Sequence, residues 1–165
     1  MLASWDDSQW ERIWMRAQTR SWRTLAVVPG DRRVSMPSFD IATFLMGVGA
    51  HLGDTIGLAD FRDVRLVHAA AFLEVAAWHV DSGERLVFAM KSIAENPASV
   101  RFAQAADCAI LCVSLGETPL ASARDTIDQI GRDRFVGSII VRPTTVTPSK
   151  DESLSVRGDY ELVRP

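Results

Sequence analysis

Two acidic side chains and one basic side chain lie close together immediately after an apolar segment. Asp60 ends the run 55–60, which has the composition of a buried strand, and Arg62 and Asp63 follow it. Carboxylates at the end of a strand can bind a hard cation, and an arginine beside them can bind a phosphate group. Two structural roles compete with this interpretation: a solvated loop, or a cap for a helix that begins near Val64.

A second group of charged residues lies in the loop 29–38. Arg32 and Arg33 could meet an anion there, although a solvated basic pair is the alternative interpretation. A phosphate-binding loop supplies converging backbone amides from glycines, usually together with a lysine and a serine or threonine. This loop has one glycine and no lysine, and its two prolines remove amide donors. The usual phosphate-binding motif is therefore absent from this loop.

The remaining reactive side chains form no recognisable catalytic pattern. The three histidines all fall on expected helices, where packing and surface roles are common: His51, His68 and His79. Ser92 and Ser114 end strands, but the sequence places no histidine beside either hydroxyl to activate it. Cys108 and Cys112 are too far apart within one strand for a disulfide, and no second Cys or His pair indicates zinc. We expect buried free thiols and no catalytic residue, metal or cofactor.

These residues must be positioned by a regular alternation of strands and helices. Five apolar runs have the composition of buried strands: 24–28, 55–60, 85–90, 109–113 and 136–141. Helical patterns separate them, at 39–52, at 65–80, within 92–106 and from 119 to 130. This alternation predicts an α/β fold, with a doubly wound, mainly parallel five-stranded sheet covered by helices on both faces, as in Rossmann-like and P-loop-NTPase-like folds. Ligands of such sheets bind beyond the carboxyl ends of the strands.

The N-terminal segment carries four of the five tryptophans and predicts a helix over residues 5–23. Trp10 and Trp14 fall at helical spacing on one side, and Glu11 and Arg16 belong to the charged side. Tryptophan and arginine are enriched at binding hot spots, so these four residues are candidates for binding a partner. The alternatives are a helix that packs on its own domain and a membrane-surface helix, which the acidic residues disfavour.

The chain is expected to divide into the N-terminal helix (1–23), an α/β domain (24–143) and a flexible polar tail (144–165). Within the tail, residues 160–163 could pair along a sheet edge. The formal net charge of −3 gives no general attraction to nucleic acid or to acidic lipid. No apolar run approaches the length of a membrane span and no signal-peptide pattern is present, so we expect a cytoplasmic protein.

Three features of the chain match one known family. The second expected strand ends in Asp60-Phe-Arg62, an acidic segment that carries an arginine. A later strand, residues 106–113, reads Ala-Asp followed by an apolar run, before a turn that contains Thr118. The N-terminal helix contains glutamate and arginine.

On these features the chain, over roughly residues 10–142, resembles the cytoplasmic ATPase domain of bacterial tyrosine kinases of exopolysaccharide and capsule synthesis. These kinases belong to the deviant P-loop group that includes the MinD and ParA ATPases. In that family the N-terminal helix mediates self-association, and Glu11, Arg12 and Arg16 occupy the comparable place. The resemblance implies a P-loop NTPase fold with degenerate Walker motifs.

Three departures from the family argue against catalysis. The phosphate-loop lysine and Ser/Thr have no counterpart in 29–38, and the second metal-binding aspartate is replaced around Met90–Ser92. One tyrosine, Tyr160, stands where the kinases carry a cluster. We therefore expect a pseudokinase that retains the scaffold and acts by binding a protein. Its vestigial nucleotide site would consist of Arg32, Arg33, Asp60 and Arg62.

The expected partner is a polysaccharide co-polymerase, which would recruit the chain to the inner membrane, an active ATPase, or a second copy of the chain. Two other functions stay open from the sequence. The chain could be a divergent nucleotide-binding enzyme, an ATPase or kinase with a non-standard phosphate site. It could also be an adaptor of pilus or secretion machinery, as degenerate MinD relatives are.

Overall fold

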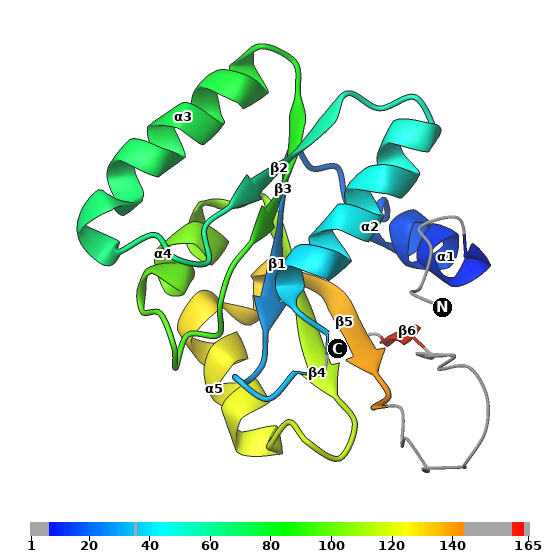
Figure 1. Cartoon of the computed structure of the whole chain (residues 1–165), viewed down its shortest axis with the longest axis vertical. Helices are drawn as coiled ribbons and strands as arrows, with labels where there is room; N and C mark the ends of the chain where they lie inside the picture. The colour runs from blue at the N-terminus through cyan, green and yellow to red at the C-terminus, as the bar shows by residue number, and fades with distance from the viewer. Residues whose placement is uncertain (1–6, 35, 144–159, 164–165) are drawn as a thin grey trace, which may run out of the picture.

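Five apolar segments lie side by side as parallel strands in the computed structural model (Figure 1). They are β1 (Thr24–Pro29), β2 (Ile56–Asp60), β3 (Arg85–Ala89), β4 (Cys108–Ser114) and β5 (Phe135–Val141). A sixth strand, β6 (Tyr160–Val163), pairs antiparallel with β5, and the order across the sheet is β2-β3-β1-β4-β5-β6. The structure describes residues 7–34, 36–143 and 160–163, the last four by their backbone only. The expected α/β fold with a mainly parallel sheet is confirmed.

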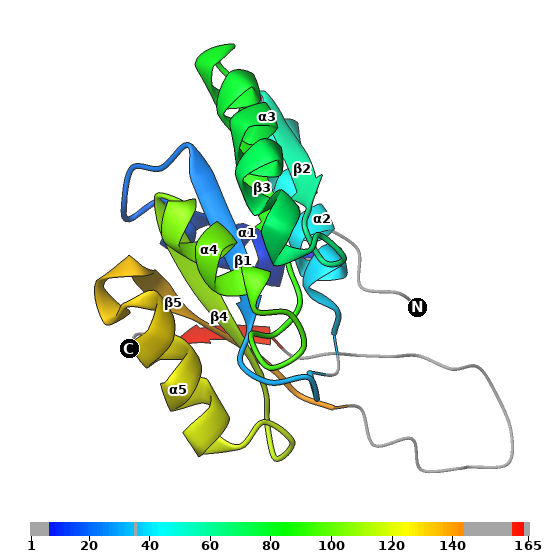
Figure 2. The same ribbon diagram turned by 90° about the vertical axis from the view of Figure 1, so that its left-hand side faces the viewer.

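Helices connect the parallel strands and cover both faces of the sheet (Figure 2). The helices are α1 (Ser8–Ala17), α2 (Ser38–His51), α3 (Ala69–Asp81), α4 (Ala98–Ala105) and α5 (Leu120–Ile130), with short 3-10 turns at Leu66–His68 and Arg132–Arg134. One buried cluster joins α1 and α2 to one face of the sheet, and a second joins α3, α4 and α5 to the other. None of the described helices is long and apolar enough to cross a bilayer.

The N-terminal helix is shorter than the sequence predicts and belongs to the core. α1 ends at Ala17 instead of near residue 23, and the side chain of Asp7 caps its start by accepting a hydrogen bond from the Gln9 amide at 3.0 Å. Trp10 is completely buried and Trp14 is 2% exposed. For these two side chains the packing alternative holds, because the chain's own residues cover them. Glu11 and Arg16 remain exposed.

An arginine anchors this tryptophan cluster to the sheet. The guanidinium of Arg85, at the start of β3, lies 3.6 Å from the centroid of the Trp22 ring, and the Trp22 ring meets Trp14 edge-on at 5.6 Å. Arg85 also donates hydrogen bonds to Asp54 at 3.1 Å and to Gln18 at 2.9 Å. A stacked, hydrogen-bonded guanidinium fixes the segment after α1 against the amino end of β3.

Gly49 allows α1 to pack closely on α2. The ring of Trp14 lies directly against Gly49. A Cβ atom added at Gly49 would lie 2.6 Å from Cη2 of Trp14. A glycine inside a helix weakens it, so the close contact with the indole is the physical reason for its presence.

The two edges of the sheet differ. On one side, residues 160–163 form β6 and pair with Ser138–Val141 of β5, which confirms that this segment can pair along an edge. The rest of the expected tail, 144–159 and 164–165, lies outside the described residues. On the other side, no described strand pairs with the outer edge of β2.

We predict that Gly49→Ala lowers the free energy of unfolding, although alanine favours a helix by about 1 kcal/mol over glycine. The added methyl group would clash with Trp14, and overpacking of this kind costs roughly 1–3 kcal/mol. Urea unfolding of the wild type and the variant measures the difference. The matched control repeats the substitution in a Trp14→Leu background, where Gly49→Ala should be neutral or stabilising. An equal cost in both backgrounds would contradict the assigned contact.

Candidate functional site

The strand order defines where a ligand would be expected to bind. β1 and β3 are neighbours, but the chain leaves β1 for α2 on one face and leaves β3 for α4 on the other. In doubly wound sheets the crevice between two such diverging loops is the ligand site. Here the two diverging loops are 30–37, in which residue 35 lies outside the described residues, and 90–97, both at the carboxyl edge of the sheet.

Polar groups at the ends of these loops are engaged in hydrogen bonds of the chain itself. The buried hydroxyl of Ser38 donates a hydrogen bond to the carbonyl oxygen of Met90, which joins the two loops. Pro37 precedes α2, and no side chain caps the first turn of this helix. The Ser99 hydroxyl donates to the Lys91 carbonyl at 2.7 Å. The Ser38 bond thus joins the start of α2 to the end of β3, and the Ser99 bond joins α4 to the loop after β3.

Asp60 and Arg62 form one bidentate ion pair at the end of β2. Nε and Nη2 of Arg62 each donate to a different carboxylate oxygen of Asp60 at 2.8 Å. The hydrogen bond from Arg62 is the main reason that the pKa of Asp60 is lowered, and the same bond raises the pKa of Arg62. The guanidinium also lies 4.4 Å from the ring centroid of Phe39, in the first turn of α2. Arg62 is thus held beside the α2 N-terminus, with its charge balanced.

Asp63 pairs with a lysine that the sequence did not single out. Nζ of Lys91, directly after β3, donates to Asp63 at 2.6 Å, and this bond raises the pKa of Lys91. Asp63 does not cap a helix, since α3 begins only at Ala69, after a 3-10 turn. The side chain of Asn96 donates to the carbonyl oxygen of Val64 at 2.9 Å and so ties the loop after β2 to the loop after β3.

The basic pair after β1 lies apart from Asp60 and Arg62. Nε of Arg33 donates to the carboxylate of Asp31 at 3.1 Å, while Arg32 is exposed. Burial alone would raise the pKa of Asp31, but hydrogen bonds from the Arg33 side chain and from the amides of Arg32 and Arg33 lower it. The structure therefore brings together two of the four expected nucleotide-site residues, Asp60 and Arg62. Arg33 forms a separate ion pair with Asp31, and the side chain of Arg32 is exposed.

Three residues were missed from the sequence: Phe39 beside Arg62, Lys91 beside Asp63, and Asp31 in the separate pair with Arg33. Lys91 follows an apolar run, which marks the end of a strand, but only the strand order shows that β3 lies beside β2. Each of three basic side chains has a carboxylate partner: Arg62 with Asp60, Lys91 with Asp63, and Arg33 with Asp31. Because these charges balance, the cluster offers an incoming anion little net attraction.

The other reactive residues are placed for structural roles. Both cysteines are buried and free, as expected, and burial raises the pKa of Cys108 to about 12, so it is not a thiolate at neutral pH. The Ser92 hydroxyl bonds to Glu95 at 2.8 Å, and Nδ1 of His79 lies 2.7 Å from the Glu84 carboxylate. Among the described residues, no three His, Cys, Asp or Glu side chains are grouped so that they could hold a metal ion.

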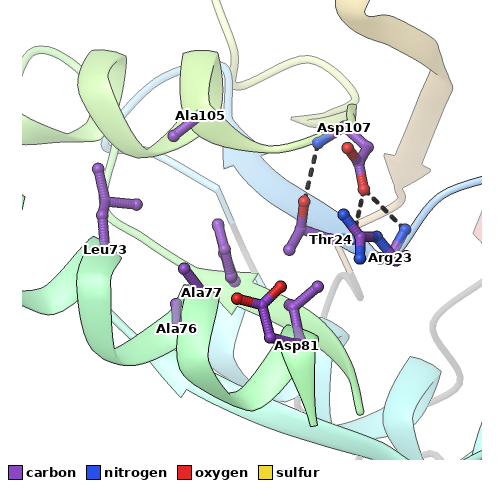
Figure 3. A pocket seen from close by; sticks show the side chains of 10 residues that line it. Arg23, Thr24, Leu73, Ala76, Ala77, Asp81, Ala105 and Asp107 are labelled. Carbon is purple, nitrogen blue, oxygen red and sulfur yellow. Dashed lines mark hydrogen bonds between the residues drawn. The ribbon is translucent and has the colours of Figure 1, made fainter. Parts of the chain in front are cut away.

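A cavity of about 280 Å³ lies at the opposite, amino edge of the sheet (Figure 3). Its walls come from α3, from the end of α4 and from β1 and β3, and most of the lining is apolar. Asp107 is already engaged there, since its carboxylate accepts hydrogen bonds from the amides of Arg23 at 2.7 Å and Thr24 at 2.9 Å. Burial would raise the pKa of Asp107, and these bonds lower it. Asp107 thus joins β4 to β1, and we assign it a structural role.

Comparisons with known proteins assign the chain to no family. No protein-family model matches the chain, and no curated protein matches it significantly. The structure defines the chain as a doubly wound α/β domain with three ion pairs in the loops at the carboxyl edge of its sheet. Its function is therefore inferred from the fold and from the residues at this edge.

We predict that Arg62→Gln raises the pKa of Asp60 toward the ordinary aspartate value of about 3.9. In the wild type the lowered pKa means that the pair stabilises the fold above that value, and that this stabilisation is lost as the pH falls through the folded-state pKa. Carbon-detected NMR of the aspartate carboxyls measures both titrations. Asp107, held by backbone amides, is the internal control and should be unchanged. An unchanged Asp60 pKa would contradict the bidentate pair.

Proposed function

We propose that this chain is a catalytically inactive pseudo-ATPase, a degenerate relative of the tyrosine kinases of exopolysaccharide and capsule synthesis, and that it acts by binding a protein. The observation that carries the proposal is the charge balance at the carboxyl edge. Among the basic side chains of the loops at this edge, Arg62, Lys91 and Arg33 each have a carboxylate partner in the same chain, while the exposed Arg32 forms no ion pair within the described residues.

The loop between β1 and α2 supports the same proposal. It contains one glycine and two prolines within 29–38, and its Ser38 hydroxyl is used by the Met90 carbonyl. A phosphate site needs several converging amides and a free hydroxyl for the metal. The prolines of this loop lack amide donors and the Ser38 hydroxyl is already bonded, so the loop favours a scaffold over a phosphate site.

The partner class follows from the family resemblance and from the exposed charges of α1. A polysaccharide co-polymerase at the inner membrane, an active ATPase or a second copy of the chain would meet the exposed side of this helix, with Glu11 and Arg16. Trp10 and Trp14 would support this surface from beneath, because they fix α1 on the sheet. The chain would then regulate or recruit its partner in polysaccharide synthesis and export.

A divergent nucleotide-binding enzyme is the second candidate, favoured by the position of Asp60 and Arg62 at the carboxyl end of β2. This carboxylate and guanidinium could separate to bind a magnesium ion and a phosphate. An adaptor of pilus or secretion machinery shares the inactive scaffold with the first proposal and differs from it only in the partner.

Thermal unfolding with and without millimolar Mg-ATP or Mg-ADP separates the first two candidates. A ligand at 100 times its dissociation constant adds about 2.7 kcal/mol to the stability of the folded state. For a pseudo-ATPase we expect no change in the unfolding midpoint. An upward shift that disappears in Asp60→Asn, but persists in the exposed control Asp128→Asn on α5, would refute the proposal in favour of the enzyme.

The partner surface has its own test. Calorimetry of the purified chain with the cytoplasmic domain of a co-polymerase or ATPase encoded in the same gene cluster measures the affinity. We expect Arg16→Glu to weaken binding by about tenfold or more, with the unfolding midpoint unchanged because Arg16 is exposed. Arg101→Glu, an exposed reversal on α4, is the matched control. Equal binding by both variants would remove α1 as the docking element.

A further inference from the structure

The cavity at the amino edge of the sheet has an apolar interior and a charged rim. It has a volume of about 280 Å³ and lies between α3 and the end of α4, against β1 and β3 (Figure 3). Phe88, which is 1% exposed, lines it from the sheet, and Leu73 and Val80 line it from α3. Pockets for drug-sized molecules have volumes of about 300–1,000 Å³. This cavity is therefore of a size for a smaller molecule.

Three alanines leave this space between the two helices. Ala76 and Ala77 line the cavity from α3, and Ala105 lines it from the last position of α4. Protein interiors are normally close-packed, with few voids larger than a water molecule. The hollow between α3 and α4 thus depends on small side chains, and a single larger side chain at one of these positions would fill much of it.

The charged groups of the rim favour a positively charged ligand. Two carboxylates line the cavity, those of Asp81 and Asp107, against one guanidinium, that of Arg23. Burial would raise the pKa of Asp107, but its hydrogen bonds from backbone amides and the charge of Arg23 lower it. Asp81 forms no ion pair with any described residue, and Figure 3 shows its carboxylate pointing toward the space between α3 and α4. Asp81 therefore supplies the unbalanced negative charge.

The ends of the two helices add to this negative potential. Asp81 is the last residue of α3 and Ala105 is the last residue of α4, so the cavity lies at the C-termini of both. A helix C-terminus carries a partial negative charge, which a cation stabilises and a carboxylate opposes. Asp81 is thus a carboxylate at the helix end that favours a cation. A positively charged ligand beside it would offset both the carboxylate and the two helix ends.

We infer that this cavity binds a small organic ammonium ion, a molecule with an apolar body and one positive charge. The body lies against Phe88, Leu73 and the alanines, and the ammonium group donates a charge-assisted hydrogen bond to Asp81. An anion would meet Asp81 and the helix ends with like charge, and a neutral molecule would leave Asp81 without a counter-ion. The site lies at the opposite edge of the sheet from Asp60 and Arg62, so the inference does not depend on the proposed function.

NMR titration of the nitrogen-15-labelled full chain with 2-phenylethylammonium tests the site. The neutral probe 2-phenylethanol and the anionic probe 3-phenylpropionate have nearly the same apolar body. We expect the ammonium to bind at least tenfold more tightly than the alcohol, the anion to bind most weakly, and the amide shifts to change at the ends of α3 and α4. No binding of the ammonium at millimolar concentration, equal binding of ammonium and alcohol, or shifts confined to other parts of the chain would each overturn the inference.

Asp81→Asn separates the charge of the site from its shape. The variant should lose the preference for 2-phenylethylammonium over 2-phenylethanol and keep the affinity for the alcohol, because the apolar lining is unchanged. Asp128→Asn is the matched control, since it removes an exposed carboxylate from the last turn of α5, away from the cavity. A preference that survives in Asp81→Asn, or that is lost equally in Asp128→Asn, would overturn Asp81 as the counter-ion.

Ala77→Leu tests the cavity itself. Ala77 is exposed and leucine is a good helix former, so the variant should fold, which circular dichroism checks. The larger side chain should weaken the binding of both the ammonium and the alcohol by tenfold or more. Ala71→Leu, at an exposed position of α3 that does not line the cavity, is the matched control and should bind as the wild type does. Unchanged binding by folded Ala77→Leu, or by Ala105→Leu if Ala77→Leu unfolds, would overturn this cavity as the site.

Discussion

A parallel sheet has two apolar faces, and neither can be left in water. In this chain the strand order sends three connecting helices to one face and a single one, α2, to the other. α2 cannot cover that face alone, so α1 must lie beside it. This requirement explains the buried tryptophans, the Arg85 anchor and the glycine under the Trp14 ring. The N-terminal segment is therefore part of the α/β domain, and its buried tryptophans stabilise the fold.

The same strand order fixes the chemistry at the carboxyl edge. Since β2, β3 and β1 are consecutive in the sheet, the charged residues after β2 and β3 come within hydrogen-bonding distance of one another. Arg33, Arg62 and Lys91 each have a neighbouring carboxylate, and the serine at the start of α2 is bonded to the next loop. An edge of this kind is well suited to holding loops in place. That property is the physical basis for proposing a scaffold whose function lies in its surfaces.

How much was predictable depended on whether a feature is local. The strands were located to within a residue or so, because a run such as Ala109–Val113 with no polar alternation has few alternatives to a buried parallel strand. Asp60 and Arg62 were found because they are two residues apart. Lys91 was not, since its partner Asp63 is 28 positions away and meets it only when β2 and β3 pair. The limits of α1 and α3 were missed because capping and 3-10 turns shift helix ends.

The sequence by itself determined the alternation of strands and helices, the buried thiols and the lack of a phosphate-binding loop, all of which follow from short-range pattern and residue type. Only the tertiary structure decided which face each helix covers, which charges neutralise each other, and that Trp10 and Trp14 on α1 are buried while Phe72, Val75 and Trp78 on α3 are exposed. Both segments are rich in apolar residues, and sequence composition cannot distinguish them. Their difference arises from packing, because the tryptophans of α1 are enclosed between α2 and the sheet, whereas no described element covers the outer side of α3.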